Sequence, residues 1–119
     1  MKEVQRLIRS ADFAQVYERG KWLNSGCLSL KYCSNDLDVS RFGFVVSKRV
    51  GGAVVRNQVK RRLREIIRSV PLRHGRDVIV SARPQAAIAS FSVMQTTLMG
   101  LLERVGLIIN DEKNRLSYD

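Results

Sequence analysis

The spacing of apolar residues near the N-terminus predicts a short helix. Residues 10–20 read SADFAQVYERG, in which Ser10 is placed to cap a helix and Gly20 to end it. The apolar side chains that share one face of this helix are Phe13, Val16 and Tyr17. We therefore expect the helix to pack on the rest of the molecule through these three residues.

The next segments have the patterns of strands. Residues 26–33 alternate between apolar and other side chains, which predicts a half-buried strand. A turn cluster, SNDLD, separates it from residues 40–49, whose β-branched and aromatic content predicts a second strand. We expect the two strands to form an antiparallel hairpin. Residues 21–25 could hold one further short strand.

The C-terminal half predicts a helix, a strand and a second long helix. Residues 54–69 form a basic helix, considered below, and residues 76–83 have a nearly continuous apolar centre, typical of an interior strand that Pro84 ends. Ser90 caps a helix over 91–106. Its apolar residues recur at helical spacing and are Phe91, Met94, Leu98, Leu101, Leu102 and Val105. The tail after residue 107 is polar.

This order of elements, α-β-β-α-β-α, predicts an α+β fold with the two layers of an α/β sandwich. The 119 residues, 45% of them apolar, suit one domain with a modest core. No apolar run approaches the ~20 residues that span a bilayer, and the N-terminus lacks the apolar segment of a signal peptide. We expect a cytoplasmic protein without a membrane partner.

The charge distribution points to a binding function, because the net charge of +10 is concentrated in one part of the chain. Residues 41–83 hold twelve basic and two acidic residues, whereas the segments on either side are nearly neutral. Such a concentration is expected of a surface that binds a polyanion, and nucleic acid is the leading candidate.

The basic helix separates its apolar and charged residues cleanly. On a helical wheel Val59, Leu63, Ile66 and Val70 form a buried stripe, and Arg62 and Glu65 flank one side of it. The other side carries a continuous basic face. Its members are Arg56, Asn57, Lys60, Arg61, Arg64 and Arg68.

A solvated surface helix would pair charges of opposite sign four residues apart, but here they have the same sign. Arg56 with Lys60, Lys60 with Arg64, and Arg64 with Arg68 each cost roughly 0.2–0.5 kcal/mol. An external polyanion would relieve this repulsion. Arginine outnumbers lysine on this helix, which favours bidentate phosphate contacts.

The segment FGFVVSKRVGGAVVRNQVKRRLREIIR resembles the signature of the bacterial ribonuclease P protein subunit. The motif positions are Arg56, Asn57, Lys60, Arg61, Arg62, Arg64 and Glu65. Three outer segments are also similar to the family: RLIRSADFAQVYERGK, GRDVIVSARP and LMGLLERVGLI. Gly52 departs from the family, in which many members have a polar residue, and this affects only the loop before the helix.

The resemblance implies a fold and a function. The family fold is similar to the second domain of a small-subunit ribosomal protein and contains an unusual left-handed β-α-β crossover. In this family the protein partners a catalytic RNA, and together they remove the 5′ leader of precursor tRNA; the resemblance implies one protein per RNA. Magnesium needed by this holoenzyme is bound by the RNA, so the protein alone is expected to bind no cofactor.

The resemblance also implies two RNA-binding surfaces. Contacts with RNA are implied for Ser47, Lys48, Arg49, Arg56, Asn57, Lys60, Arg61, Arg62, Arg64 and Arg68. The cleft for the single-stranded leader is implied to contain Phe13, Tyr17 and Lys31, since unpaired bases stack on aromatic rings. From the residues alone, core packing with Val16 is the alternative for the two rings.

No catalytic group is evident in this chain. Phosphodiester cleavage needs a carboxylate cluster for metal ions or a general acid and base, but His74 is alone in a turn and Asp36 and Asp38 suit a turn. Glu65 is expected to pair with a neighbouring arginine. Cys27 and Cys33 would lie ~20 Å apart along a strand, too far for a disulfide, and no zinc-binding set is present.

Two other functions fit part of the pattern. A ribosomal RNA-binding protein would share the basic face and the fold, but the full RNQVKRRLRE register and the aromatic pair distinguish the ribonuclease P family. A DNA-binding protein could place the basic helix in the major groove, but no helix-turn-helix partner precedes it.

Overall fold

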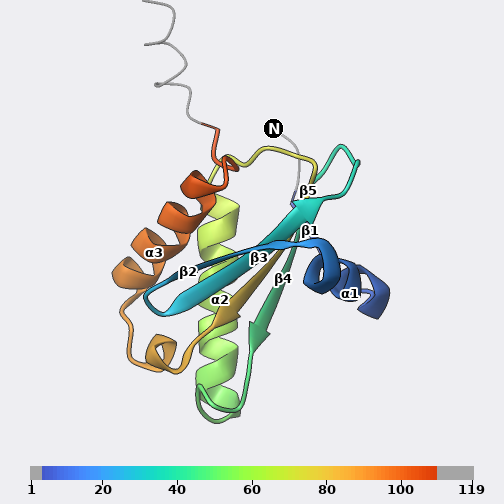
Figure 1. Cartoon of the computed structure of the whole chain (residues 1–119). Coiled ribbons are helices and arrows are strands. Elements are labelled where there is room, and N and C mark those ends of the chain that lie inside the picture. Colours follow the sequence, from blue (N-terminus) through green and yellow to red (C-terminus); the bar gives the residue numbers. More distant parts are fainter. Residues whose placement is uncertain (1–3, 110–119) are drawn as a thin grey trace, which may run out of the picture.

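A computed structural model describes residues 4–109 of the chain. A five-stranded sheet in the order β1-β4-β5-β3-β2 is its centre (Figure 1). The elements along the chain are β1 (Gln5–Arg6), α1 (Ser10–Arg19), β2 (Lys21–Ser25), β3 (Leu28–Ser34), β4 (Arg41–Val46), α2 (Ala53–Ser69), β5 (Arg76–Ala82), a 3-10 turn (Pro84–Ala87) and α3 (Phe91–Arg104). The α+β sandwich is confirmed.

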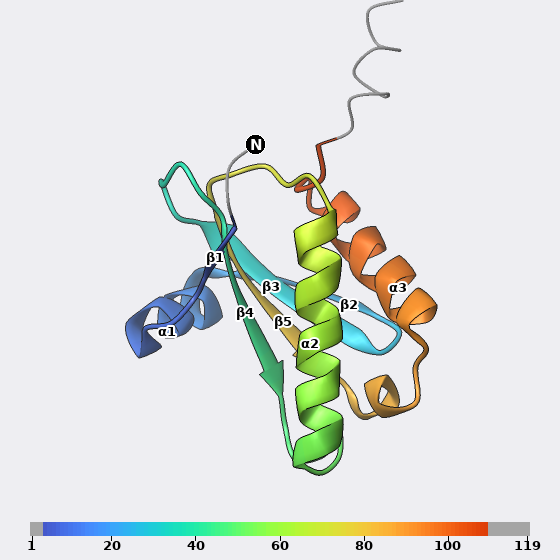
Figure 2. The ribbon, with the colours of Figure 1, turned by 180° about the vertical axis from the view of Figure 1, so that it is seen from behind.

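Helices cover both faces of the sheet. Figures 1 and 2 show α2 and α3 on one face and α1 on the other. The main core lies between the sheet and the α2–α3 layer, where Leu63, Ile66 and Leu98 are fully buried. A smaller cluster lies under α1 and consists of Leu7, Val16 and Ile79, with Phe13 packed against it. The two faces of the sheet are therefore available for different tasks.

The expected β3–β4 hairpin is wrong, because β5 lies between these two strands. It pairs with β3 antiparallel and with β4 in parallel. The connection between β3 and β4 instead crosses the start of β5. There the backbone N–H of Asn35 donates to the carbonyl of Gly75 (3.0 Å), and the backbone N–H of Gly75 donates to the carbonyl of Val39 (3.2 Å). The interior position expected for β5 is confirmed, with Val78, Ile79 and Val80 almost completely buried.

The crossover from β4 through α2 to β5 is left-handed. The two strands are parallel neighbours. Seen from the α2 side in Figure 2, with the strands turned to point upward, β5 lies to the left of β4. A right-handed connection is strongly preferred in general. The expectation drawn from the family resemblance is therefore confirmed against the general rule.

Helix boundaries agree with the pattern except at α1. Ser90 caps α3, its hydroxyl accepting a hydrogen bond from the Val93 amide (3.1 Å). At α1, however, Arg9 occupies the N-cap position without a side-chain hydrogen bond, so the prediction that Ser10 caps this helix is wrong. Gly20 does end α1, with an extended φ of −71°. Glycine is needed there because a Cβ would collide with the backbone carbonyl oxygen of Val16.

The remaining differences concern short or terminal segments. The short strand expected at 21–25 is present as β2, whereas β1 has only two residues and carries no detectable pattern. In α3 the helix ends at Arg104, and Phe91 is 36% exposed rather than buried. The polar tail from residue 110 lies outside the described residues. Within residues 4–109 no helix has the length and apolar character required to cross a membrane.

Candidate nucleic-acid interface

The basic face of α2 carries cations that the protein itself does not neutralise. Its apolar stripe is buried as expected, with Val59 and Leu63 at most 2% exposed. Arg61 and Arg68 are exposed, whereas Arg56, Lys60 and Arg64 are half-buried along their stems. Among residues 4–109, none of these side chains forms an ion pair with a carboxylate. The repulsion along this face is therefore not relieved within the described part of the chain.

Glu65 differs from expectation, whereas Arg62 lies where the helical wheel placed it. Glu65 is exposed and has no ion pair within residues 4–109, so its predicted pairing with a neighbouring arginine is wrong. Arg62 lies on the other side of the helix, where its Nη1 donates a hydrogen bond to the carbonyl of Ala89 (3.2 Å). This contact ties α2 to the segment before α3 and separates Arg62 from the basic face.

Two shallow depressions adjoin the basic face. One is lined by Val54, Asn57, Gln58, Arg61 and Arg64. The other lies between α2, β4 and β1, and its lining includes Arg6, Arg64, Arg68 and the partly buried Phe44. Guanidinium and amide groups around such depressions are donors for phosphate oxygens. Arg6 was missed by sequence reasoning, because β1 is too short to show a periodicity.

The turn between β4 and α2 extends the cationic surface. Ser47, Lys48 and Arg49 are all exposed, and the Ser47 hydroxyl accepts a hydrogen bond from the Arg49 amide (3.3 Å). At the start of α2, Nε of Arg56 donates to the carbonyl of Gly51 (3.2 Å), which anchors this arginine beside the turn. The structure thus places the turn residues next to the first arginine of the helix.

On the opposite face of the sheet, Tyr17 and Lys31 lie together. Nζ of Lys31 donates to the carbonyl of Tyr17 (2.6 Å) and lies 5.6 Å from the centroid of its ring. The Tyr17 ring is 47% exposed. An exposed aromatic ring beside an ammonium group can stack on a base while the cation approaches a phosphate.

Phe13 has a different environment from Tyr17. It is half-buried and packs against the small cluster under α1. Gly43 makes room for its ring, since a Cβ at that position would lie 2.5 Å from Cζ of Phe13. Phe13 therefore contributes to packing under α1, which was the alternative for this residue, whereas Tyr17 remains accessible.

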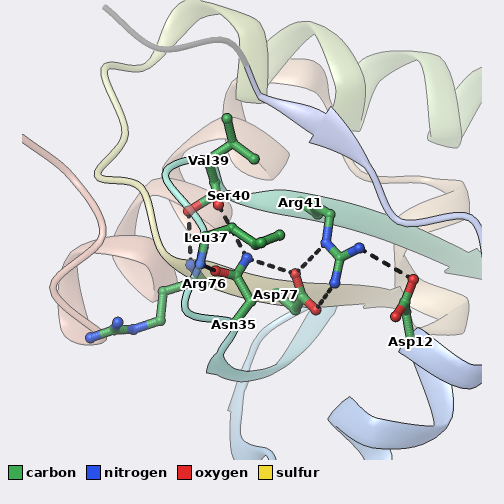
Figure 3. A network of polar contacts seen from close by, with 8 residues as sticks. All are labelled: Asp12, Asn35, Leu37, Val39, Ser40, Arg41, Arg76 and Asp77. Atoms are coloured by element: carbon green, nitrogen blue, oxygen red, sulfur yellow. Dashed lines mark hydrogen bonds and ion pairs between the residues drawn. The ribbon is translucent and has the colours of Figure 1, made fainter.

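A partly buried network of ion pairs links α1 to the sheet (Figure 3). Nε and Nη2 of Arg41 donate to the two carboxylate oxygens of Asp77 (2.8 and 2.6 Å), and Nη1 reaches Asp12 of α1 (3.2 Å). Asn35 donates a further hydrogen bond to Asp77 (2.9 Å). The hydrogen bonds that Arg41 donates to Asp77 raise the pKa of Arg41 above its already high ordinary value. Sequence reasoning missed this network, because its members are far apart in the chain.

Groups with catalytic potential are dispersed. His74 is exposed in the turn before β5. Within residues 4–109 no three histidine, cysteine or acidic side chains lie close enough to hold a metal ion. Cys27 and Cys33 are both free thiols, as expected, and burial raises the pKa of each. The arrangement of the described side chains suits binding and positioning of a polyanion.

Comparison with known proteins identifies the relatives of this chain. The family model described as Ribonuclease P matches residues 1–106. The ribonuclease P protein component of Dehalococcoides mccartyi strain CBDB1 is 38% identical over 120 residues, covering 100% of both chains. That of Clostridium acetobutylicum is 37% identical over 118 residues, covering 96% of this chain and 98% of the relative.

Solved structures agree with the fold. The RNase P protein of Staphylococcus aureus has a TM-score of 0.80 at 29% identity, covering 90% of this chain and 100% of that one. The RNase P protein of Thermotoga maritima has a TM-score of 0.75 at 31% identity, covering 84% and 96% respectively. Since sequence similarity spans the whole chain and the same architecture recurs in solved relatives, the chain belongs to the ribonuclease P protein family.

Proposed function

We propose that this chain is the protein subunit of a bacterial ribonuclease P, which binds the catalytic RNA and assists removal of the 5′ leader from precursor tRNA. The observation that carries this proposal is the basic face of α2, whose cations have no carboxylate partner within residues 4–109. RNA phosphates supply the compensating charge. Because the chain belongs to the ribonuclease P protein family, we propose that the polyanion it binds is the RNA of that ribonucleoprotein.

The two faces of the sheet are proposed to bind different RNA segments. The α2 face, with the turn at Ser47, Lys48 and Arg49, is proposed to contact the catalytic RNA. The α1 face, with Tyr17 and Lys31, is proposed to contact the unpaired leader. Since α1 and α2 lie on opposite sides of one sheet, the protein can touch both RNAs at once.

Bond cleavage is assigned to the RNA partner. The magnesium ions of the holoenzyme would stabilise the charge that develops on the attacked phosphate, and we propose that RNA groups hold them. The protein's own buried carboxylate, Asp77, is occupied by Arg41 and Asn35. The cations of this chain bind and orient phosphates. One protein per RNA and a cytoplasmic location complete the proposal.

Reconstitution tests this function. The cognate catalytic RNA is supplied with precursor tRNA at low magnesium, with and without the protein, and 5′ leader removal is measured. We expect the protein to restore cleavage that the RNA alone performs poorly under these conditions. Absence of stimulation would favour the ribosomal RNA-binding alternative, and cleavage by protein free of RNA would contradict the assignment of chemistry to the RNA.

Replacing Tyr17 by alanine should weaken binding of precursors with long leaders by about 1–3 kcal/mol, the usual contribution of one base stacked on an aromatic ring. A precursor with a one-nucleotide leader should be affected little. The measurement is the equilibrium affinity of the holoenzyme for both precursors. Tyr17→Phe keeps the ring and serves as the control. Equal weakening of both precursors by Tyr17→Ala would exclude a leader contact.

A further inference from the structure

The connection between α2 and β5 places three nitrogen-bearing side chains close together. Arg73 and His74 are exposed, and Arg76 is half-buried. They line a depression of about 470 Å³, which is within the size range of ligand pockets. The other lining residues are Leu72, Gly106, Leu107 and Ile109. The depression therefore lies between this connection and the segment that follows α3, at the end of the sheet that the connection crosses in Figures 1 and 2.

The backbone that carries the two arginines is held in place on both sides. On one side the N–H of Arg73 donates to the carbonyl of Leu107 (2.8 Å). On the other side the buried hydroxyl of Ser40 donates to the carbonyl of Arg73 (2.7 Å) and accepts from the N–H of Arg76 (3.1 Å). Because this backbone is already ordered, a ligand that binds the arginines would lose little affinity to ordering of the loop.

The charges of the two arginines are not neutralised within residues 4–109. Neither has an ion pair there, and the lining of the depression contains no carboxylate. The Nη1 of Arg76 donates one long hydrogen bond to the carbonyl of Gly75 (3.5 Å). In Figure 3 the Arg76 side chain points away from the network around Asp77. Most of the N–H groups of both guanidinium groups are therefore available to a ligand.

Compensation of helix dipoles does not account for these two cations. The C-terminal ends of α2 and α3 lie at this end of the molecule and carry partial negative charge. Each helix already has an arginine in its last turn, namely Arg68 in α2 and Arg104 in α3. The last carbonyls of α3 also accept hydrogen bonds from the backbone N–H groups of Gly106 and Leu107 (3.0 and 2.9 Å). The helix ends are therefore satisfied without the arginines of the depression.

The depression lies on the α2 side of the sheet and shares no lining residue with the basic face. Val78 of β5 packs in the main core, so Arg76, two residues earlier on the same strand, lies on that side as well. Tyr17 and the proposed leader contact are on the opposite side. Because β4 and β5 are parallel, the start of β5 is roughly 20 Å from the turn at Ser47, at ~3.3 Å per residue. The depression is therefore separate from both proposed RNA-binding surfaces.

We infer that Arg73, His74 and Arg76 form a binding site for a backbone phosphate of RNA. Each guanidinium can donate two parallel hydrogen bonds to phosphate oxygens, and an imidazole offers a further N–H in either protonation state. The inference rests on the proposed function, which brings RNA to this side of the sheet. The phosphate belongs to the catalytic RNA, since the depression and α2 share that side. A phosphate of the precursor tRNA would offer the same chemistry, and the experiment distinguishes the two sources.

The test replaces both arginines in the variant Arg73→Gln/Arg76→Gln. Its equilibrium affinity for the catalytic RNA should fall about tenfold to a hundredfold. The slope of log affinity against log salt should become shallower by ~0.7–0.9, the value for one phosphate. Arg73→Lys/Arg76→Lys keeps both charges and should retain most of the slope. The matched control is Arg104→Gln, because Arg104 is an exposed arginine at the same end of the molecule that does not line the depression.

A second arm measures the affinity of the reconstituted holoenzyme for precursor tRNA, where we expect no change. A loss in this arm alone would assign the phosphate to the precursor. Unchanged affinity and slope in both arms overturn the inference, as does an equal loss with Arg104→Gln. Circular dichroism verifies folding, and the single variant Arg73→Gln repeats the test at an exposed side chain. Failure of the wild-type protein to bind the catalytic RNA would instead contradict the proposed function.

Discussion

Neutralising three cations of α2 together, in the variant Lys60→Ala/Arg61→Ala/Arg64→Ala, is expected to weaken binding of the catalytic RNA about a thousandfold. A hydrogen bond that involves a charged group contributes roughly 1.5–3 kcal/mol, so three lost contacts at the lower end amount to about 4.5 kcal/mol. These side chains have no ion pairs within residues 4–109, so their removal leaves no described carboxylate without its partner. The variant should also fold, because removal of like charges relieves repulsion along the helix.

The salt dependence of binding distinguishes phosphate contacts from general destabilisation. Each lost contact should reduce the slope of log affinity against log salt by ~0.7–0.9, so the triple variant should lose about two units or more. Arg104→Ala removes one exposed arginine from the last turn of α3, far from the basic face in sequence, and serves as a charge control. An unchanged slope in the triple variant would show that these three residues do not bind phosphate.

Replacing Asp77 by alanine should destabilise the free protein by about 3 kcal/mol, the lower end of the cost of breaking a buried ion pair. Asp77 is 2% exposed and accepts two hydrogen bonds from Arg41 and one from Asn35. Its removal leaves the Arg41 guanidinium with Asp12 alone, which is why we expect the lower end. Such a loss is a large part of the ~5–15 kcal/mol that stabilises a typical domain.

Urea unfolding followed by circular dichroism measures this change. Glu103→Ala removes an exposed carboxylate from α3 and should alter the free energy of unfolding by less than ~0.5 kcal/mol. The double variant Arg41→Met/Asp77→Leu replaces both charges by apolar groups and should recover much of the lost stability. A single variant Asp77→Ala within 1 kcal/mol of the wild type would mean that the Arg41–Asp77 pair contributes little to the stability of the fold.

Elements whose apolar residues recur at a regular spacing could be predicted from the sequence. The helix over 54–69 was placed within one residue of α2, because its apolar stripe and basic face are sharply separated. The cap at Ser90 and the interior position of β5 also follow from local chemistry and composition. In these cases the local pattern and the final packing favour the same structure.

Strand pairing could not be predicted in the same way. Strands that follow each other in the chain usually pair, but here β5 lies between β3 and β4 and pairs with both. The left-handed crossover likewise opposes a general preference and was expected only through the family resemblance. Both features depend on contacts between distant segments.

The sequence predicts that the site is basic, but it does not predict the contacts of the individual residues equally well. Periodicity identified the basic face, but it could not show that Arg62 binds Ala89 or that Phe13 packs over Gly43. Arg6 carries no distinctive local pattern and lines one depression with Arg64 and Arg68 only because β1 pairs with β4. A chemical role for such residues emerges from the register of the strands.

The position of β5 has a consequence for synthesis of the protein on the ribosome. Among residues 4–109, β5 is the last strand to be made, yet it joins the β1–β4 pair to the β2–β3 pair. Before residue 82 has left the exit tunnel, the nascent chain can form only two separate ribbons, and isolated two-stranded ribbons are marginally stable. The sheet should therefore close late and cooperatively, through contacts between segments distant in sequence. A nascent chain arrested before β5 should remain sensitive to proteases.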